Sequence, residues 1–534
     1  MGHLQRICEL EAGYPEATDP LVSVDQIFQS LNSLWQSLKS LVNEDDSIAL
    51  FKMIGNLYED VFLAPTCSKV IAAPEASATN TTVELPAHSI YEIITTFRPL
   101  AQLSYMNSHR HDALHTIAAW MNARWPTRCA VNVLELYAAM RPIWREYIRF
   151  DASTRHPGDW SDCFNPLGLR KIEQLHELRV RTWQNLHDSV TASDSITSVN
   201  SARVEEICSS IPDWYKPVIG ACLFVQPAEP SCTSWVLNSA EEGTGRLGSR
   251  FLYAMDIATR QSYIDHYLKR SACEAGELVD ITCIQGDTLN LHPIQTARVL
   301  ELNHTNLDLP PCRRLSLNEI SVIVDHRSQL PQLIDKSGAR LLPVHLGGAS
   351  LCFMPSFVRF LSLLGPGEIN PPIPAARTNK SEGIEVQQRV VIGNLILRRR
   401  RWVVSAETLS SLLTGSASQI FLKLNQWRET NGIPARIFVR EKVKHEVVTV
   451  KFKPQYLDFR APLFIDLLRS IVAKAGQSII LEEMVPDLDS LPTDERGNLW
   501  ATEVLIDSLA FEHSSPCTSK IKCHTYSTIT PNRA

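Results

Sequence analysis

The periodicity of apolar residues changes near residue 215, and this change constrains the fold more than any other feature of the sequence. In the first part of the chain, apolar residues recur every three or four positions, which predicts helices with one apolar face. The clearest cases are residues 27–41 and residues 169–186, the second of which follows a break at Asn165 and Pro166.

After residue 215, short runs rich in β-branched residues replace the helical period. Such runs predict strands, here at residues 218–225, 278–284, 320–324, 390–397, 437–439 and 447–452. A helical pattern returns at residues 462–475. The sequence therefore predicts an α+β fold, with a helical N-terminal third followed by mixed lobes of sheet and helix.

A chain of 534 residues is long enough for several domains or one large unit with several lobes. Residues 370–386 are rich in Pro, Thr, Asn and Lys, which is typical of a linker. The predicted order is a helix-rich region (1–200), an α+β lobe (201–369), a linker (370–386), a C-terminal α+β lobe (387–511) and a disordered tail (512–534).

The cellular location is predicted from two further features. No stretch approaches the 18 or more apolar residues of a membrane helix, and the N-terminus lacks the pattern of a secretory signal. The 13 cysteines include no Cys-x-x-Cys pair, which favours reduced thiols over a disulfide framework. We therefore expect a cytoplasmic protein that does not enter a membrane.

Positive charge is concentrated in residues 391–460. This segment holds 13 Lys or Arg against five acids, whereas the whole chain has a formal charge of −6. On one strand, Arg398 and Arg400 would face one side and Arg399 and Arg401 the other. Aromatic residues are interleaved with these cations. The segment is either a solvated face or a contact for a nucleic-acid backbone.

A second segment, residues 241–251, combines glycine with arginine. Gly243, Gly245 and Gly248 allow a tight turn or a close approach to a ligand, and Arg246 and Arg250 offer forked donors to a carboxylate or phosphate. Two interpretations remain: an anion site, or a glycine turn between strands with arginines on the surface.

Several common motifs are absent from the sequence. It contains no phosphate-binding Gly-x4-Gly-Lys-Ser/Thr loop, no nucleophile elbow and no His-Glu-x-x-His zinc motif. His111 and His115 could share a helix face, but no third ligand is evident, so no metal site is predicted. If the protein forms an acyl bond, we therefore expect the acyl group to have been activated beforehand by another enzyme.

Four segments in the last third, taken in order, resemble the closing portion of the N-terminal, glutamylating domain of lantibiotic dehydratases. They are residues 389–402, 421–440, 453–468 and 480–487. Residues 243–251, 290–293 and 342–347 resemble the middle section of that domain. The resemblance extends from about residue 110 to 505 and is most specific after residue 389.

This resemblance implies transfer of glutamate from glutamyl-tRNA to Ser or Thr hydroxyls of a ribosomally made precursor peptide, in lanthipeptide antibiotic biosynthesis. The implied partners are tRNA, the precursor peptide and a separate elimination-domain protein. Aminoacyl-tRNA is a co-substrate, and no cofactor is implied. We expect Arg246 and Arg250 to act in catalysis, as anchors for the aminoacyl carboxyl, a phosphate or an oxyanion. The expected tRNA contacts are Arg398, Arg399, Arg400, Arg401, Arg428 and Arg440.

The resemblance covers a glutamylation domain without its elimination domain, so we do not expect this chain alone to complete a dehydration. Two alternatives to an active transferase remain. One is a non-catalytic module that binds tRNA or peptide, and the other is a truncated remnant of the family.

Overall fold

A computed structural model describes much of the chain between residues 84 and 522. Outside the description lie residues 1–83, 86, 105–107, 154–161, 194, 213–219, 250, 253–254, 256, 274–275, 283–291, 303–308, 349–350, 352–353, 368, 370–371, 375, 382, 442–453, 475–477, 492–502, 509–520 and 523–534. The predicted helix at 27–41, the predicted strand at 447–452, nearly all of the tail and Arg250 fall in these ranges. The fold below is that of one compact unit, Glu84–Cys283 with His292–Ile521.

Helices dominate the first part of this unit. The predicted helices at 169–186 and 462–475 are confirmed as α7 and α14. The helices are α4 (Ala87–Ser104), α5 (Arg110–Arg124), α6 (Val133–Ser153), α7 (Arg170–Asp188), α8 (Ser201–Ser209), α9 (Arg246–Ser249), α10 (Ile257–Ser271), α11 (Ser356–Leu363), α12 (Ala406–Leu412), α13 (Ala417–Thr430) and α14 (Phe464–Lys474). Short 3₁₀ turns lie at Pro311–Arg313, Leu317–Glu319 and Leu488–Ser490.

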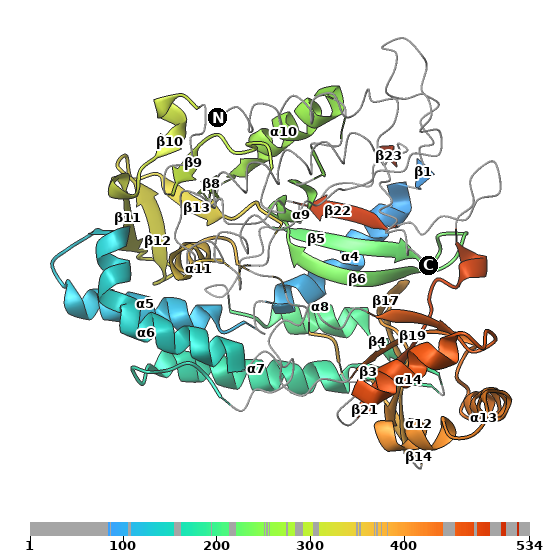
Figure 1. Ribbon diagram of the computed structural model, residues 1–534. Helices are drawn as coiled ribbons and strands as arrows, with labels where there is room; N and C mark the ends of the chain where they lie inside the picture. Colours follow the sequence, from blue (N-terminus) through green and yellow to red (C-terminus); the bar gives the residue numbers. More distant parts are fainter. Residues whose placement is uncertain are drawn as a thin grey trace, which may run out of the picture. The chain divides into compact units, whose positions relative to one another are not determined.

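Most strands belong to three sheets, two of them mixed and one antiparallel, so the α+β prediction is confirmed (Figure 1). The first has seven strands in the order β22 (Val504–Ser508), β5 (Ala221–Pro227), β6 (Trp235–Glu242), β17 (Leu395–Arg398), β16 (Arg389–Ile392), β4 (Ile196–Val199) and β3 (Val190–Ala192).

The second sheet has eight strands. Its order is β10 (Arg314–Leu315), β9 (Val299–Glu301), β8 (Gly276–Thr282), β13 (Arg340–Val344), β12 (Pro331–Asp335), β11 (Ile320–Val324) and β2 (Val131–Asn132), with β7 (Ala272–Cys273) also on β8. The third has six: β14 (Thr378–Ser381), β15 (Ile384–Gln387), β18 (Arg401–Ser405), β21 (Ser478–Glu483), β19 (Arg436–Glu441) and β20 (Gln455–Asp458). Short strands β1 (Glu84–Leu85) and β23 (Ile521–Lys522) lie near the two ends of the described range.

Two hydrophobic cores explain why these elements form. In the first, apolar faces of α5, α6 and α11 pack with the inner residues of β11 and β13, such as Val322 and Leu341. In the second, helices α12, α13 and α14 supply Leu409, Leu424 and Leu468 against the six-stranded sheet (Figure 1). Burial of these apolar faces is the main favourable contribution to the fold.

The sheets cross the boundaries that composition predicted. The second half of the expected linker, 370–386, forms β14 and most of β15, which are hydrogen-bonded strands. Strands β16 and β17, from the expected C-terminal lobe, pair with β4 and β6. Composition detects exposed, polar segments, but it does not show that such a segment pairs as an edge hairpin.

A buried ion pair joins α5 to α7. Asp112 accepts hydrogen bonds from Arg179 at 2.7 and 3.0 Å, and both side chains are almost fully buried. Asp112 also lies 3.1 Å from the Nδ1 atom of His109. Burial acts to raise the pKa of Asp112, but Arg179 and His109 outweigh it and lower that pKa. No helix in the described part of the chain is both long and apolar enough to cross a membrane.

We predict that Asp112→Asn destabilises the protein strongly, because it removes the negative charge that pairs with the buried Arg179 guanidinium. Losing one partner of a buried pair costs about 3–5 kcal/mol. The matched control is Glu135→Gln, which breaks the exposed Arg128–Glu135 pair and should cost less than about 1 kcal/mol. Urea denaturation measures both. Equal losses would contradict a structural role for the buried pair.

Candidate functional site

The four consecutive arginines lie at the junction of two sheets. β17 ends at Arg398 and β18 begins at Arg401, with Arg399 and Arg400 between them. The expectation that all four alternate along one strand is therefore wrong. The chain leaves one sheet and enters another within this run, so the four guanidinium groups diverge in direction and partner.

Two glutamates on β21, Glu482 and Glu483, form ion pairs with arginines from three other strands. Arg401 Nε lies 2.5 Å from Glu482 Oε2, and Arg440 Nη2 lies 3.7 Å from the same oxygen. β18 and β19 flank β21, which explains why both arginines reach Glu482. Glu483 pairs with Arg389 through two contacts of 2.7 and 2.8 Å and accepts from the backbone N–H of Arg400.

Positive charge exceeds negative charge in this group. We define the arginine cluster as the six residues Arg389, Arg398, Arg399, Arg400, Arg401 and Arg440, which surround Glu482 and Glu483. All six guanidinium-bearing residues are half-buried, so ligands in solution can reach them. Six guanidinium groups face these two carboxylates and Glu503, which acts on Arg399, so an accessible excess of positive charge remains and attracts anions.

Arg398 and Arg399 carry most of this excess. Among the described residues Arg398 makes no ion pair; burial lowers its pKa to about 10, and Arg401 and Arg440 act in the same direction. Within the described ranges, Arg399 donates to two neutral acceptors, the Val485 carbonyl at 3.0 Å and the Asn238 side chain at 2.9 Å. The Arg400 guanidinium lies over the Trp402 ring at 4.9 Å, a cation–π contact.

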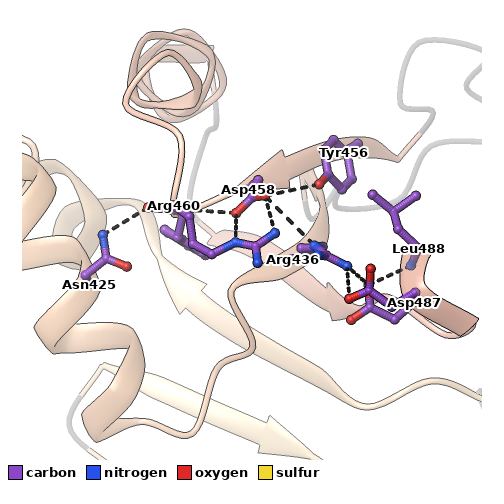
Figure 2. A network of polar contacts seen from close by, with 9 residues as sticks. Asn425, Arg436, Tyr456, Asp458, Arg460, Asp487 and Leu488 are labelled. Carbon is purple, nitrogen blue, oxygen red and sulfur yellow. Dashed lines mark hydrogen bonds and ion pairs between the residues drawn. The ribbon is translucent and has the colours of Figure 1, made fainter.

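Two other arginines of the basic segment are neutralised by carboxylates. Arg436 contacts Asp487 at 2.6 Å and Asp489 at 3.0 Å, while Arg460 binds Asp458 (Figure 2). Asp487 and Asp489 lie outside residues 391–460, so the charge of the segment overstates its local field. The structure does not bring Arg428 into the arginine cluster.

Arg428 has its partners within α13 and the turn that follows. Its guanidinium donates to Asn425, to Glu429 and to the Ile433 carbonyl. Four of the aromatic residues interleaved with the cations are also engaged: Trp402 and Phe459 are buried, and Phe421 and Trp427 pack against the same core. These rings stabilise the lobe and do not form an exposed stacking surface for bases.

The glycine and arginine segment forms a tight turn between β6 and α9. Gly245 has a φ of +82°, and a Cβ at this position would lie 2.7 Å from the Tyr267 ring. The turn places Arg246 against the preceding strand, where its Nη2 lies 2.9 Å from Glu241 and its Nε 2.8 Å from Glu242 Oε1. Arg246 is thus buried and paired, and its expected role as a substrate anchor stays a prediction.

A cavity of about 90 Å³, partly open to solvent, lies next to this turn. Its lining combines aromatic, acidic and basic side chains, among them Trp144, Tyr147, Glu242, Thr244, His345 and Arg359. A concave, mainly preformed space with a few polar groups is typical of a ligand site.

Burial changes the acid–base properties of two residues that line this cavity. It raises the pKa of Glu242, although Arg246 opposes the rise. It lowers the pKa of His345 to about 4, with help from the charges of Arg246 and His292 and weak opposition from the Ile281 backbone. At neutral pH His345 is therefore uncharged. Perturbed groups of this kind concentrate at functional sites.

Two more buried carboxylates lie near these residues. Asp280 accepts from the Leu346 backbone N–H at 3.3 Å, and its Oδ2 is 3.5 Å from His292 Nε2. Burial raises the pKa of Asp507 to about 7; its hydrogen bond from Tyr263 lowers that pKa, and Glu242 raises it further. Among the described residues, no group of three or more His, Cys, Asp or Glu side chains is arranged to hold a metal ion.

Comparison with solved structures shows the fold class of the chain. The glutamylation domain TbtB, from thiomuracin biosynthesis, matches at 24% sequence identity and a TM-score of 0.61, over 78% of this chain and 49% of that one. The same domain bound to 5'-phosphodesmethylglutamycin matches at 22% identity and a TM-score of 0.62, over 79% and 50%. The tRNA dependent lantibiotic dehydratase MibB from Microbispora sp. 107891 has a TM-score of 0.41 at 15% identity, over 54% and 28%.

The chain therefore has the fold of a glutamylation domain, and the resemblance seen in the sequence is confirmed at the level of the fold. It spans about half the length of the TbtB chains that it matches. No protein-family model matches the sequence, and no curated protein matches it.

Sequence reasoning missed Glu242 and His345 as site residues. Both stand inside segments that the resemblance includes or adjoins, residues 241–251 and 342–347. The missed signal is the pair Glu241-Glu242 directly before a glycine turn that contains an arginine. Such a turn reverses the chain, so the arginine side chain contacts the two glutamates that precede the turn.

We predict that Gly245→Ala lowers the stability of the protein for two reasons: the positive φ at this position and a clash of the added Cβ with Tyr267. A left-handed conformation costs a residue with a Cβ roughly 1–2 kcal/mol. Gly338→Ala is the matched control, because Gly338 has a φ of +84° and nothing within 4 Å of its added Cβ. The Tyr267 clash should add about 1–3 kcal/mol. Equal thermal midpoints for the two variants would contradict this expectation.

Proposed function

We propose that this chain transfers an aminoacyl group, glutamate in the first instance, from tRNA to Ser or Thr hydroxyls of a ribosomally made precursor peptide. It would act in the cytoplasm on a lanthipeptide-like pathway, with a separate protein eliminating the glutamate. The fold of a glutamylation domain supports this reaction class. The proposal concerns one half of a dehydration.

The observation that carries the proposal is the excess charge of the arginine cluster. A tRNA is a polyanion, and phosphate contacts from arginine dominate affinity for such ligands. Arg398 and Arg399, which form no ion pair with a carboxylate in the described part of the chain, are the best placed to bind phosphate. Arg401 and Arg440 share one carboxylate, so their charges are only partly offset.

Strand β6 connects this cluster to the cavity. Asn238, which binds Arg399, and Glu242, which lines the cavity, are four residues apart on β6. At about 3.3 Å per residue, their separation along the strand is about 13 Å. β17 runs parallel to β6, and its register places Arg398 level with Asn238. A single-stranded tRNA end held by the cluster could therefore place its terminal ester in the cavity.

Acyl transfer is tested with the full chain, glutamyl-tRNA and the peptides encoded next to its gene, with and without neighbouring gene products. Mass spectrometry should show an increase of one glutamyl residue on a serine or threonine. Absence of transfer in every combination would overturn the enzyme proposal. Binding of tRNA without transfer would instead identify a non-catalytic module.

We predict that Arg398→Gln weakens tRNA binding and reduces the salt dependence of the affinity by about one unit of log–log slope. The matched control is Arg460→Gln, because Asp458 already neutralises the Arg460 charge. The control should bind tRNA as the unaltered chain does. Filter binding at several salt concentrations measures both variants, and identical slopes for Arg398→Gln and the unaltered chain would exclude a phosphate contact there.

A further inference from the structure

Two side chains that line the cavity are candidates for accepting a proton there. Glu242 has its Oε1 atom 2.8 Å from Arg246 Nε, while its Oε2 atom is buried with no hydrogen-bond partner among the described residues. His345 is 5% exposed, and neither of its ring nitrogens makes a geometrically good hydrogen bond within the described chain. Buried polar atoms are normally paired, so two groups with unused hydrogen-bonding atoms at a cavity are suited to bind a ligand there.

The properties of these groups decide which of them acts as the base. Burial lowers the pKa of His345 to about 4, which makes it a poor proton acceptor. The same cause raises the pKa of Glu242, so its carboxylate is a stronger base than an exposed one. General bases work best when their pKa approaches the working pH. Glu242 is therefore the better candidate.

Arg246 fixes the direction of this carboxylate. It contacts Glu241 through Nη2 and Glu242 through Nε, so it holds two consecutive side chains at once. The Nε contact with Glu242 is an ion pair without good hydrogen-bond alignment. This arrangement restrains Oε1 and leaves Oε2 to accept a proton. Arg246 is then a positioning residue for Glu242.

We propose, resting on the proposed function, that the cavity beside α9 is the site of acyl transfer and that Glu242 is its general base, with a hydroxyl-bearing peptide side chain as substrate. Glu242 takes the hydroxyl proton while the hydroxyl oxygen attacks the ester carbonyl carbon of aminoacyl-tRNA. The bond from that carbon to the ribose oxygen breaks, and the ribose oxygen receives the proton from Glu242. One ester replaces another, and no further reactant is consumed.

The test replaces Glu242 and varies the acidity of the nucleophile. General-base catalysis contributes about 10²–10⁴-fold, so Glu242→Gln should lower kcat for a serine acceptor at least about 100-fold. With cysteine at the acceptor position, the thiol has a pKa near about 8.5 and ionises without help. The loss with the cysteine peptide should then be below about tenfold. A variant that was merely misfolded would lose both activities equally.

Controls separate this inference from the proposed function. Glu241→Gln removes the other partner of Arg246, which is more exposed at 38% and does not line the cavity, and it should keep kcat within a few fold. Binding of tRNA through the arginine cluster should be the same in all variants. If Glu242→Gln does not fold, Glu242→Asp takes its place, with the same selective loss for serine expected.

Three results would overturn one or both proposals. Equal losses with serine and cysteine peptides, in a variant that unfolds at the same temperature as the unaltered chain, would show that Glu242 is not the base, while the proposed function stands. Full activity of Glu242→Gln with the serine peptide would do the same. No transfer by the unaltered chain would overturn the proposed function and this inference together.

Discussion

The hairpin of β16 and β17 is inserted between β4 and β6, and much of the unit depends on these two parallel pairings. They join residues near 196, 236 and 396 in one sheet, although these segments are far apart in the sequence. The same pairings place Arg398 beside β6, and the chain then continues into β18, a strand of the six-stranded sheet. The arginine cluster and the cavity owe their proximity to this one insertion.

Incomplete charge compensation explains the electrostatics of both regions. At the junction of the sheets, two glutamates meet six arginines, so the lobe is stable while positive charge remains available. Near the cavity the uncompensated charge is negative. Burial of Glu242 and Asp507 raises the pKa of both carboxyl groups, and nearby cations do not offset this rise. By contrast, Arg179 and Asp112 form a buried ion pair of opposite charges that joins two helices. Whether a buried charge has its partner thus distinguishes structural groups from candidate functional ones.

The sequence predicted long periodic elements well and tertiary pairing poorly. Helix α7 and strand β11 were placed to within two residues, because their apolar periodicity is strong and local. The hairpin at 390–397 was read as one strand, since its turn depends on Gly393 at positive φ in an otherwise apolar run. The neutralisation of Arg436 by Asp487 and Asp489 could not be predicted, because these residues meet only through the pairing of β19 with β21 and the turn that follows. For the same reason Glu242 and His345, about 100 residues apart, gave no joint signal.

Strand β22 closes one edge of the seven-stranded sheet and comes from the last part of the described chain. Its five residues pair with β5, and Asp507 stands opposite Cys222 there. Unpaired strand edges are templates for association with other chains. A version of this protein ending before Val504 would carry the bare backbone of β5 on its surface, and such a product would tend to self-associate and aggregate.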